Sequence, residues 1–413
     1  MGWNAYWNRG SVLVDVIDVG RGHRRILPVI EELYNDGCNL IYLGNPSILD
    51  ENEKEYFTSI HPMTSFLRIE NDDSLRPKTN LCRLAPEIVK NVAIDRSKEY
   101  IICNPRIVIV DNDHSKLFPG KFRKYVKNLF KIDRSRCAPG VIFVTNQLVL
   151  DCNIPWLTPL ERLITYKHGL FTNIEFVLDM PNKYEKFSID PRAFIVAEHD
   201  KKIKFVGQPH PKKPDYVPET VEEVRLYLEK THKKELPQME GKIPILCSVT
   251  DNQIREVSKH AAKELNKRGY IPIISNTQSS DSEDYVTISN NEDYRSILFS
   301  PTIKTIVIRG GHTSISWAGY CGKRMVLIPI RGHPEQIRNA KRVDEGIGTG
   351  KYLPIEEVQK NPSVFADAIV SVDNDEAMKK RAEQWSAVSN RPKNDYVKNC
   401  VEATKELYEE ILW

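Results

Sequence analysis

Hydrophobic and polar positions recur along the chain as a short apolar run, a polar turn and a longer amphipathic segment. The first such unit opens with the apolar run 11–19, SVLVDVIDV, followed by the polar turn 20–23, GRGH. The next segment, ILPVIEELYNDG, carries apolar residues at helical spacing and stops at Gly37. A β-branched run predicts a buried strand, and the helical spacing predicts an amphipathic helix. Together with the apolar run 39–43, the pattern predicts a right-handed βαβ unit.

The same alternation continues along the rest of the chain, so the fold class that it predicts is α/β with parallel sheets. Further apolar runs predict strands, and further amphipathic segments predict helices. The predicted strands are 106–110, 141–145, 174–178, 193–196, 243–249, 271–275, 305–309 and 325–330, and the predicted helices are 84–99, 155–168, 254–268, 355–369, 375–388 and 395–413.

Length and a change of composition predict two domains. The chain has 413 residues, which exceeds the size at which a single hydrophobic core stops growing. Proline and charged residues dominate the stretch 208–242, which has room for one polar helix and is typical of an interdomain linker. We therefore expect a first domain over 1–207, a second domain over 243–390 and a final helical segment over 391–413.

Composition narrows the functional classes. Hydrophobic residues make up 40% and charged residues 28% of the chain, and the net charge is +3. This composition is typical of a globular protein, and the small net charge argues against a dedicated nucleic-acid binder. The sequence also contains no apolar run long enough to span a membrane. The eight cysteines form no Cys-x-x-Cys pair, which indicates neither a zinc site nor a disulfide framework. Reduced thiols and the lack of a signal-peptide core predict a cytoplasmic protein, and contact with the inner face of a membrane stays open.

The stretch 305–350 contains two strand-to-helix turns in succession. Gly310 and Gly311 follow the first apolar run and let the backbone turn sharply. The polar residues 312–314 then open a helix that Gly322 ends, and the second turn leads into another helix near residue 337. A helix start that follows a glycine turn offers free backbone N–H groups and the positive end of the helix dipole. The sequence therefore predicts an anion site that favours phosphate.

Several motifs in this stretch occur in a recognisable order: a Gly-Gly-x-x-Ser turn, a strand ending in Pro, a Glu-Gln-x-x-Asn-Ala segment and a Gly-Ile-Gly. This order resembles the donor-binding half of nucleotide-sugar glycosyltransferases of the GT-B fold, in particular the UDP-glycosyltransferase, macrolide-glycosyltransferase and MurG-like groups. In that family the glycine turn holds the donor diphosphate, and the acidic-Gln pair holds the sugar hydroxyls. The resemblance implies donor-binding roles for Thr250, Gly310, Gly311, His312, Thr313, Ser314, Glu335, Gln336 and Asn339.

One position departs from the family pattern. The family has Glu three residues after the Ser of the glycine turn, where it grips the donor ribose, and this chain has Trp317. An indole offers a hydrogen-bond donor and no acceptor, whereas a carboxylate offers acceptors only. The resemblance therefore leaves open which base the nucleotide carries and how its ribose is held.

The opening unit resembles the start of the same family, in which a His after the glycine turn deprotonates the acceptor hydroxyl. His23 occupies that position. A neutral imidazole suits a general base because its pKa lies near the working pH. The alternative is that His23 contacts phosphate or backbone at a helix start without catalysis, and the second half of the family signature favours the base.

An acidic residue directly follows the predicted strand 106–110 and resembles the family carboxylate that orients the catalytic His. Asp111 is the first candidate and Asp113 the second, because ligand residues cluster at the carboxyl ends of parallel strands. A simple turn cap is the alternative for Asp111. Asp-x-Asp is also the metal motif of the GT-A glycosyltransferases. Since the glycine turn already supplies a diphosphate site, we expect no metal, and no cofactor apart from the nucleotide-sugar co-substrate.

The resemblance implies two Rossmann-like domains that face across a cleft, with the last helix crossing back onto the first domain. The implied activity is an inverting, metal-independent transfer of a sugar from a nucleotide-sugar donor to an acceptor hydroxyl. The first domain would bind a small-molecule, lipid or glycan acceptor, the second would bind the donor, and no nucleic acid would be a partner. Two alternatives stay open, namely a nucleotide-sugar 2-epimerase of the same fold and a non-catalytic binding protein that keeps the fold.

Overall fold

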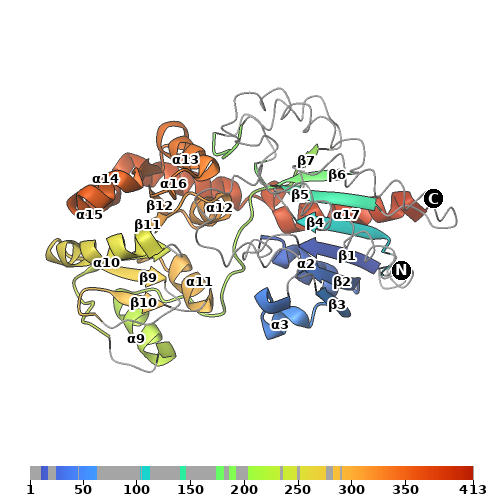
Figure 1. Cartoon of the computed structure of the whole chain (residues 1–413), viewed down its shortest axis with the longest axis horizontal. Coiled ribbons are helices and arrows are strands. Elements are labelled where there is room, and N and C mark those ends of the chain that lie inside the picture. The colour runs from blue at the N-terminus through green and yellow to red at the C-terminus, as the bar shows by residue number, and fades with distance from the viewer. Residues whose placement is uncertain are drawn as a thin grey trace. The chain divides into compact units, whose positions relative to one another are not determined.

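The computed structural model of the chain describes residues 11–16, 25–44, 46–62, 103, 105–111, 140–145, 174–180, 186–191, 203–232, 236–248, 252–275, 282–288 and 291–412. The chain divides into two structural units (Figure 1). The first unit comprises Met1–Lys183, Asp190–Pro209 and Lys393–Trp413, and the second comprises Tyr184–Ile189 and His210–Pro392. Each unit has its own parallel sheet and its own hydrophobic core.

The sheet of the first unit has the strand order β3-β2-β1-β4-β5-β6-β7, and every neighbouring pair is parallel. The strands are β1 (Ser11–Val16), β2 (Asn39–Gly44), β3 (Ser59–Pro62), β4 (Ile107–Asp111), β5 (Gly140–Thr145), β6 (Ile174–Val177) and β7 (Ile203–Phe205). The chain builds outward from β1 toward β3 and then from β4 toward β7. The strand order therefore reverses between β1 and β4.

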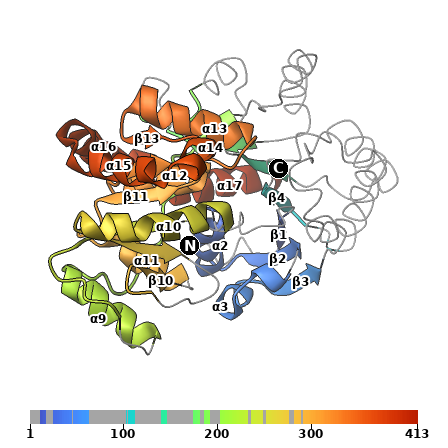
Figure 2. The ribbon, with the colours of Figure 1, turned by 60° about the vertical axis from the view of Figure 1, so that its left-hand side comes forward.

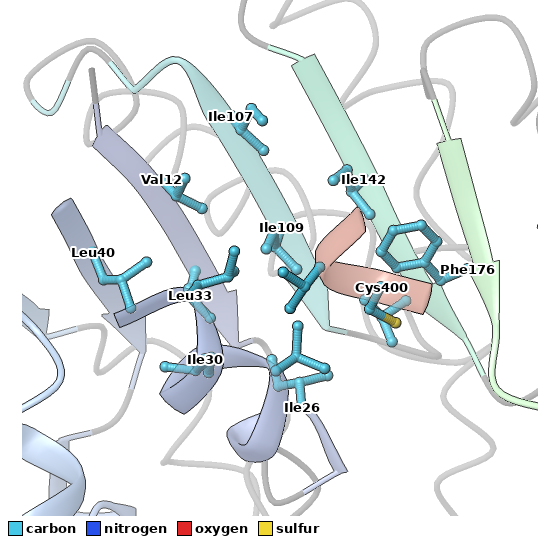
Figure 3. Packing of buried hydrophobic residues seen from close by; sticks show 14 of the residues in the cluster. Val12, Ile26, Ile30, Leu33, Leu40, Ile107, Ile109, Ile142, Phe176 and Cys400 are labelled. Atoms are coloured by element: carbon cyan, nitrogen blue, oxygen red, sulfur yellow. The ribbon is translucent and has the colours of Figure 1, made fainter. Parts of the chain in front are cut away.

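Helices α2 (Leu27–Asn35) and α17 (Tyr396–Leu412) contact each other and pack on the first sheet. Figure 3 shows Leu33 of α2 and Cys400 of α17 among Val12, Ile109 and Phe176 of the strands. All five side chains are buried, so the final helix of the chain contributes directly to the core of the first unit. Two short helices, η2 (Pro46–Ile48) and α3 (Glu51–Lys54), lead from β2 into β3.

Helix α17 approaches the sheet closely at Gly140, the first residue of β5. A side chain at this position would overlap Ile411 and would press against Leu407 of α17. Gly140 therefore lets the helix lie directly on the strand, and Tyr396 and Tyr408 are buried on the same helix.

The sheet of the second unit has the order β10-β9-β8-β11-β12-β13, again with parallel neighbours throughout. Figure 2 labels three of these strands, with β11 between β10 and β13. The strands are β8 (Ile243–Ser248), β9 (Tyr270–Ser275), β10 (Val286–Ile288), β11 (Thr305–Ile308), β12 (Arg324–Leu327) and β13 (Gly350–Tyr352). The order reverses between β8 and β11, as it does between β1 and β4 in the first sheet.

Helices connect and cover the strands of the second unit. They are α9 (Val221–His232), α10 (Asn252–Lys267), α11 (Asn291–Phe299), α12 (His312–Tyr320), α13 (Pro334–Lys341), the π-helix η5 (Arg342–Ile347), α14 (Ile355–Lys360), α15 (Pro362–Asn374) and α16 (Glu376–Ser389), followed by the 3-10 helix η6 (Pro392–Asn394) of the junction with the first unit. Helices α10, α14 and α15 contact one another and share one cluster of buried residues with the strands, while α12 packs against α16.

A buried ion pair joins the amino ends of the second sheet's strands. The Asp373 carboxylate, near the end of α15, lies 2.7 Å from a guanidinium nitrogen of Arg324, the first residue of β12. The hydroxyl of Thr305 on β11 donates to the same carboxylate at 2.8 Å, and that of Tyr270 on β9 donates at 3.3 Å. Arg324 also donates to the backbone carbonyl of Asp373. One carboxylate therefore ties α15 to three strands at the edge opposite their carboxyl ends.

The two parallel, Rossmann-like sheets predicted from the sequence are confirmed, with some differences in detail. The predicted helix 355–369 is two helices, α14 and α15, because Asn361 caps α15 and Pro362 starts it. Proline suits a first helical position, where its missing N–H is not needed. The strands β3, β10 and β13 have only three or four residues each, which is too short for a clear sequence period.

The stretch 208–242, expected to be a linker, contains α9, which belongs to the second unit and buries Val224 and Leu228. The predicted helices 84–99 and 155–168 and the predicted strand 193–196 lie outside the described residues. Within the described part of the chain, no helix is long and apolar enough to cross a membrane.

Candidate functional site

The carboxyl ends of β8 and β11 mark the place where a ligand is expected in the second unit. Ser248 and Ile308 are the last residues of these strands, and they pair in register. The strand order reverses here, and in open α/β sheets ligands bind at the carboxyl ends of the strands at such a reversal. Of the helices that follow strands at this edge, α10 follows β8, α12 follows β11 and α13 follows β12.

The turn after β11 requires glycine at its first position. Gly310 has φ +89°, a conformation that residues with a side chain rarely adopt. A side chain there would also lie 2.7 Å from the backbone carbonyl oxygen of Gln336 on α13. Gly311 is the N-cap of α12 and has no neighbouring atom within 4 Å of the position of a side chain. The start of α12 is thus open and uncapped by a side chain, as an anion site needs.

The three residues that open α12 differ in orientation. The His312 side chain is buried, and Nδ1 lies 3.4 Å from the hydroxyl of Ser316, which also donates to the His312 carbonyl at 2.9 Å. Thr313 and Ser314 are only half-buried. His312 can therefore offer its backbone N–H to an anion, whereas Thr313 and Ser314 can offer their hydroxyls as well.

Two carboxamides of α13 hold the neighbouring turns in place. Gln336 accepts a hydrogen bond from the Ile330 backbone N–H at 3.0 Å. Asn339 is fully buried, donates to the Gly310 carbonyl at 3.2 Å and accepts from Arg338 at 3.0 Å. The structure therefore gives Asn339 a role in supporting the glycine turn, and the donor contact that its motif implies stays a prediction.

Glu335 lies in the first turn of α13 and is half-buried. Its position at a helix start after β12 places it one strand away from the glycine turn. A carboxylate at this distance is suited to accept hydrogen bonds from ligand hydroxyls beside an anion held at α12.

An aromatic pair lies near the same edge. The rings of Tyr294 on α11 and Trp317 on α12 are 6.4 Å apart and inclined by 34°. Burial raises the pKa of Tyr294 to about 12, against the effect of its hydrogen bond with Ser248 at the end of β8. The indole N–H of Trp317 is buried and has no hydrogen-bond partner among the described residues. Trp317 can thus donate to a ligand oxygen but cannot accept from a hydroxyl.

The candidate catalytic residues belong to the first unit, and the structure describes them only in part. Asp111 is the last residue of β4 and pairs with Val16, the last residue of β1. The backbone therefore places Asp111 at the reversal of the strand order, beside the strand that leads toward His23. His23, Thr250 and Asp113 lie outside the described residues. In the described ranges, no group of three or more His, Cys, Asp or Glu side chains has the arrangement of a metal site.

The Gly-Ile-Gly motif has a packing role that the sequence does not reveal. A side chain at Gly346 would overlap the guanidinium of Arg342, and Gly348 ends the π-helix at φ +72°. Arg381 of α16 donates a hydrogen bond to the Gly348 carbonyl. Both glycines therefore leave room for arginines, and neither lies at a strand end of the candidate site.

Comparisons with known proteins bear on the fold. No family model and no curated protein matches the chain. Among solved structures, the glycotransferase of kitacinnamycin has a TM-score of 0.67 and 16% identity, with 97% of this chain and 99% of that one covered. The calicheamicin glycosyltransferase CalG4 has a TM-score of 0.65 and 14% identity, with 98% and 99% covered. The spinosyn rhamnosyltransferase SpnG, complexed with thymidine diphosphate, has a TM-score of 0.57 and 14% identity, with 96% and 100% covered. The chain therefore has the GT-B fold that these glycosyltransferases share.

Proposed function

We propose that this protein transfers a sugar from a nucleoside diphosphate sugar to a hydroxyl of an acceptor molecule. The observation that carries the proposal is the open start of α12 after Gly310 and Gly311, at the reversal of the second sheet's strand order. This is an anion site on a fold shared with sugar transferases over nearly the whole chain. The spinosyn rhamnosyltransferase, which has the same fold, binds thymidine diphosphate and a spinosyn aglycone.

In the proposed donor complex, the diphosphate binds the backbone N–H groups at the start of α12 and the hydroxyls of Thr313 and Ser314. The sugar hydroxyls meet Glu335 and Gln336, and Thr250 borders the diphosphate from the turn after β8. The Trp317 indole N–H donates to an oxygen of the nucleoside. This arrangement concentrates donors where the leaving group gains negative charge, which is how such sites lower a transition-state barrier.

The proposed reaction is a single displacement at the anomeric carbon. His23 takes the proton of the acceptor hydroxyl, and the acceptor oxygen forms a bond to the anomeric carbon as the bond to the diphosphate oxygen breaks. The nucleoside diphosphate leaves with the electron pair, so the sugar product has inverted configuration. Asp111 orients the imidazole and stabilises its charged form.

The negative charge on the leaving diphosphate is offset by the helix start, so we propose that the reaction needs neither a metal ion nor an organic cofactor. A chelator should leave the transfer rate unchanged. Loss of activity with EDTA that manganese restores would contradict this and would favour a metal site at Asp111-Asn112-Asp113.

A binding protein without transfer activity is the second candidate, and Trp317 is the residue that favours it. An indole cannot reproduce the hydroxyl contacts that a carboxylate makes in related donor sites. The deciding experiment incubates the protein with a panel of nucleotide sugars and follows donor hydrolysis and sugar transfer by mass spectrometry. Thermal unfolding in the presence of UDP, GDP and TDP reports binding separately from turnover.

The helix-start assignment is tested by replacing Thr313 and Ser314 together with alanine. Each hydroxyl donates to a charged group in the proposed complex, a type of bond worth about 1.5–3 kcal/mol. The double variant should therefore bind the nucleoside diphosphate and the nucleotide sugar more weakly by similar factors in calorimetry. Unchanged binding of both ligands would overturn the α12 site.

A further inference from the structure

A short stretch of the chain belongs to the second unit although the residues on both sides of it belong to the first. This stretch is Tyr184–Ile189, and we refer to its described residues, 186–189, as the strap. The chain passes between the units at four junctions, 183/184, 189/190, 209/210 and 392/393. The first two of these junctions exist only because of the strap.

An aromatic stack fixes the strap to the second unit. Phe187 is 1% exposed, and its ring lies parallel to that of Trp385 on α16, with 5.7 Å between the centroids. Trp385 is fully buried and packs directly on Gly319 of α12, where any side chain would overlap its ring. The strap is therefore linked through one indole to the helix whose start is the candidate diphosphate site.

A second attachment reaches the strap from the other donor-site helix. Arg342 directly follows α13 and donates to the carbonyls of Ser188 and Lys186, each at 3.0 Å. Gly346 leaves the space that the Arg342 guanidinium occupies. Lys186 in turn donates to Gln384 of α16 at 2.8 Å. The end of α13 that lies away from the candidate site thus holds the strap directly through Arg342, and the corresponding end of α12 is linked to it through Trp385.

The chain before the strap and the chain after it both form hydrogen bonds with one buried carboxylate of the first unit, that of Asp179. Asp179 is fully buried and accepts hydrogen bonds from the backbone N–H groups of Met180 at 2.8 Å and Asp190 at 2.9 Å. It also accepts from the side chain of Gln208 at 2.9 Å, and its own carbonyl accepts from Gly207 at 3.0 Å. Asp179 thereby holds the residues on both sides of the strap, Met180 and Asp190, together with the chain just before the 209/210 junction.

We propose that the strap couples the donor site of the second unit to the first unit, with Arg342 as a positioning residue. This inference rests on the proposed function, because it assumes that a bound donor changes the position or rigidity of α12 and α13. A ligand that moves or stiffens the starts of the two helices changes their far ends as well, since packed helices move as rigid bodies. The far end of α13 holds the strap carbonyls, the far end of α12 reaches Phe187 through Trp385, and Asp179 carries the constraint into the first sheet.

The test measures hydrogen exchange in residues 186–190 with and without UDP or TDP, in the wild type and in Arg342→Gln. Arg342→Gln removes the two guanidinium donors that bond to the strap carbonyls, each bond being worth about 1 kcal/mol. Without ligand, the backbone amides of the strap should therefore exchange about tenfold faster or more. The nucleoside diphosphate should slow strap exchange in the wild type and have little effect on it in the variant. Affinity for the nucleoside diphosphate should stay within about twofold, while kcat for transfer falls about tenfold, because the loss of coupling affects assembly of the catalytic state.

The matched control is Arg381→Gln. Arg381 also donates to a backbone carbonyl beside the π-helix, that of Gly348, but it makes no contact with the strap among the described interactions. Its replacement should leave strap exchange and the response to nucleotide unchanged. Equal effects in the two variants, or no effect of Arg342→Gln, would overturn the proposal. Should Arg342→Gln fail to fold, Phe187→Leu removes the aromatic stack at similar volume and should give the same pattern.

The outcome also separates this inference from the proposed function. A wild-type protein that binds no nucleoside diphosphate contradicts the proposed function and the coupling, whereas the ligand-free exchange still decides whether Arg342 holds the strap. A protein that binds nucleotide and transfers sugar, but whose strap exchange ignores the ligand, keeps its function and loses the coupling.

Discussion

The two sheets place different chemistry at the same topological position. In the first sheet, β1 and β4 end side by side at Val16 and Asp111. Asp111 is one catalytic candidate, and the other, His23, follows β1 in the sequence and lies outside the described residues. In the second sheet, β8 and β11 end side by side at Ser248 and Ile308, and a glycine turn with a helix start follows. The first pair of groups is suited to moving a proton, and the second is suited to holding an anion. The strand order thus reverses in the same way in both sheets, and the residues that follow the strands decide which chemistry each position is suited to.

The sharpest test of this division removes the proton-moving half. In His23→Ala, sugar transfer should fall by about 10² to 10⁴, the usual loss when a general base is removed. Binding of the nucleoside diphosphate should not change, because the proposed anion site belongs to the other sheet. Initial rates and calorimetry on the same preparation measure the two effects.

Asp111→Asn serves as the companion variant, since an amide keeps the shape of the carboxylate but not its charge. It should lose less activity than His23→Ala, and a larger loss in Asp113→Asn would move the orienting role two residues along the chain. Transfer at wild-type speed in His23→Ala would sink the assignment of the base.

The amino ends of the second sheet's strands lie opposite the candidate site, so a change there should affect stability and leave ligand binding intact. Asp373→Ala removes the carboxylate that faces Arg324 and leaves a buried guanidinium without its partner. Breaking a buried pair in this way costs about 3–5 kcal/mol, which urea unfolding would show as a lower free energy of unfolding. Nucleotide affinity of the folded fraction should persist, because the ion pair lies at the amino ends of the strands.

The matched control for this change is Asp367→Ala. Asp367 pairs with Arg268 at the surface of the same unit, and its side chain is 61% exposed. Exposed pairs contribute about 0–1 kcal/mol, so this variant should unfold nearly as the wild type does. A similar loss in both variants would mean that the Asp373 network adds nothing beyond an ordinary surface pair.

A smaller effect is expected from Glu335→Ala, which should distinguish the proposed phosphate contacts from the proposed sugar contacts. Glu335→Ala should weaken the nucleotide sugar by about 1.5–3 kcal/mol, the value of hydrogen bonds to a charged group. The free nucleoside diphosphate should bind as before, because Glu335 lies on α13 and the proposed phosphate contacts lie at the start of α12. Calorimetry with both ligands measures this, and equal weakening of the two would leave Glu335 as a helix-start residue only.

The smallest expected effect concerns the nucleoside. Trp317→Glu should improve binding of UDP relative to 2′-deoxyuridine diphosphate, because a carboxylate accepts from the 2′-hydroxyl and an indole does not. The ratio of the two affinities should shift by about tenfold. Trp317→Leu is the control, since it removes the indole without adding an acceptor. A ratio that is the same in all three proteins would show that residue 317 does not face the ribose.

Local signals in the sequence were enough to predict the parts of the fold that depend on local chemistry. The helix α12 was predicted because Gly310 and Gly311 precede it and Gly322, with φ +67°, ends it. The parallel sheets follow from apolar runs separated by helix-length segments. The break between α14 and α15 was missed, although the Asn361-Pro362 pair carries a recognisable start signal.

Contacts between distant residues could not be predicted in this way. Nothing in the sequence around Arg342 indicates that its partners are the carbonyls of Ser188 and Lys186, and the support of Gly310 by Asn339 depends on how α13 docks. A backbone carbonyl has no residue-specific signature, so only the folded chain identifies these pairs. For the same reason the strap has no sequence motif, whereas the glycine turn at Gly310 and Gly311 has one.

The position of α17 has a consequence for the order in which the protein takes shape during synthesis. Tyr396, Cys400 and Leu407 complete the hydrophobic core that Val12 and Leu33 begin, and Gly140 is left bare to admit the helix. The strands β1 and β2 therefore leave the ribosome well before α17, and their core can close only after α17 has emerged. By then every residue of the second unit has already emerged, so the half of the protein that is translated later can finish folding first.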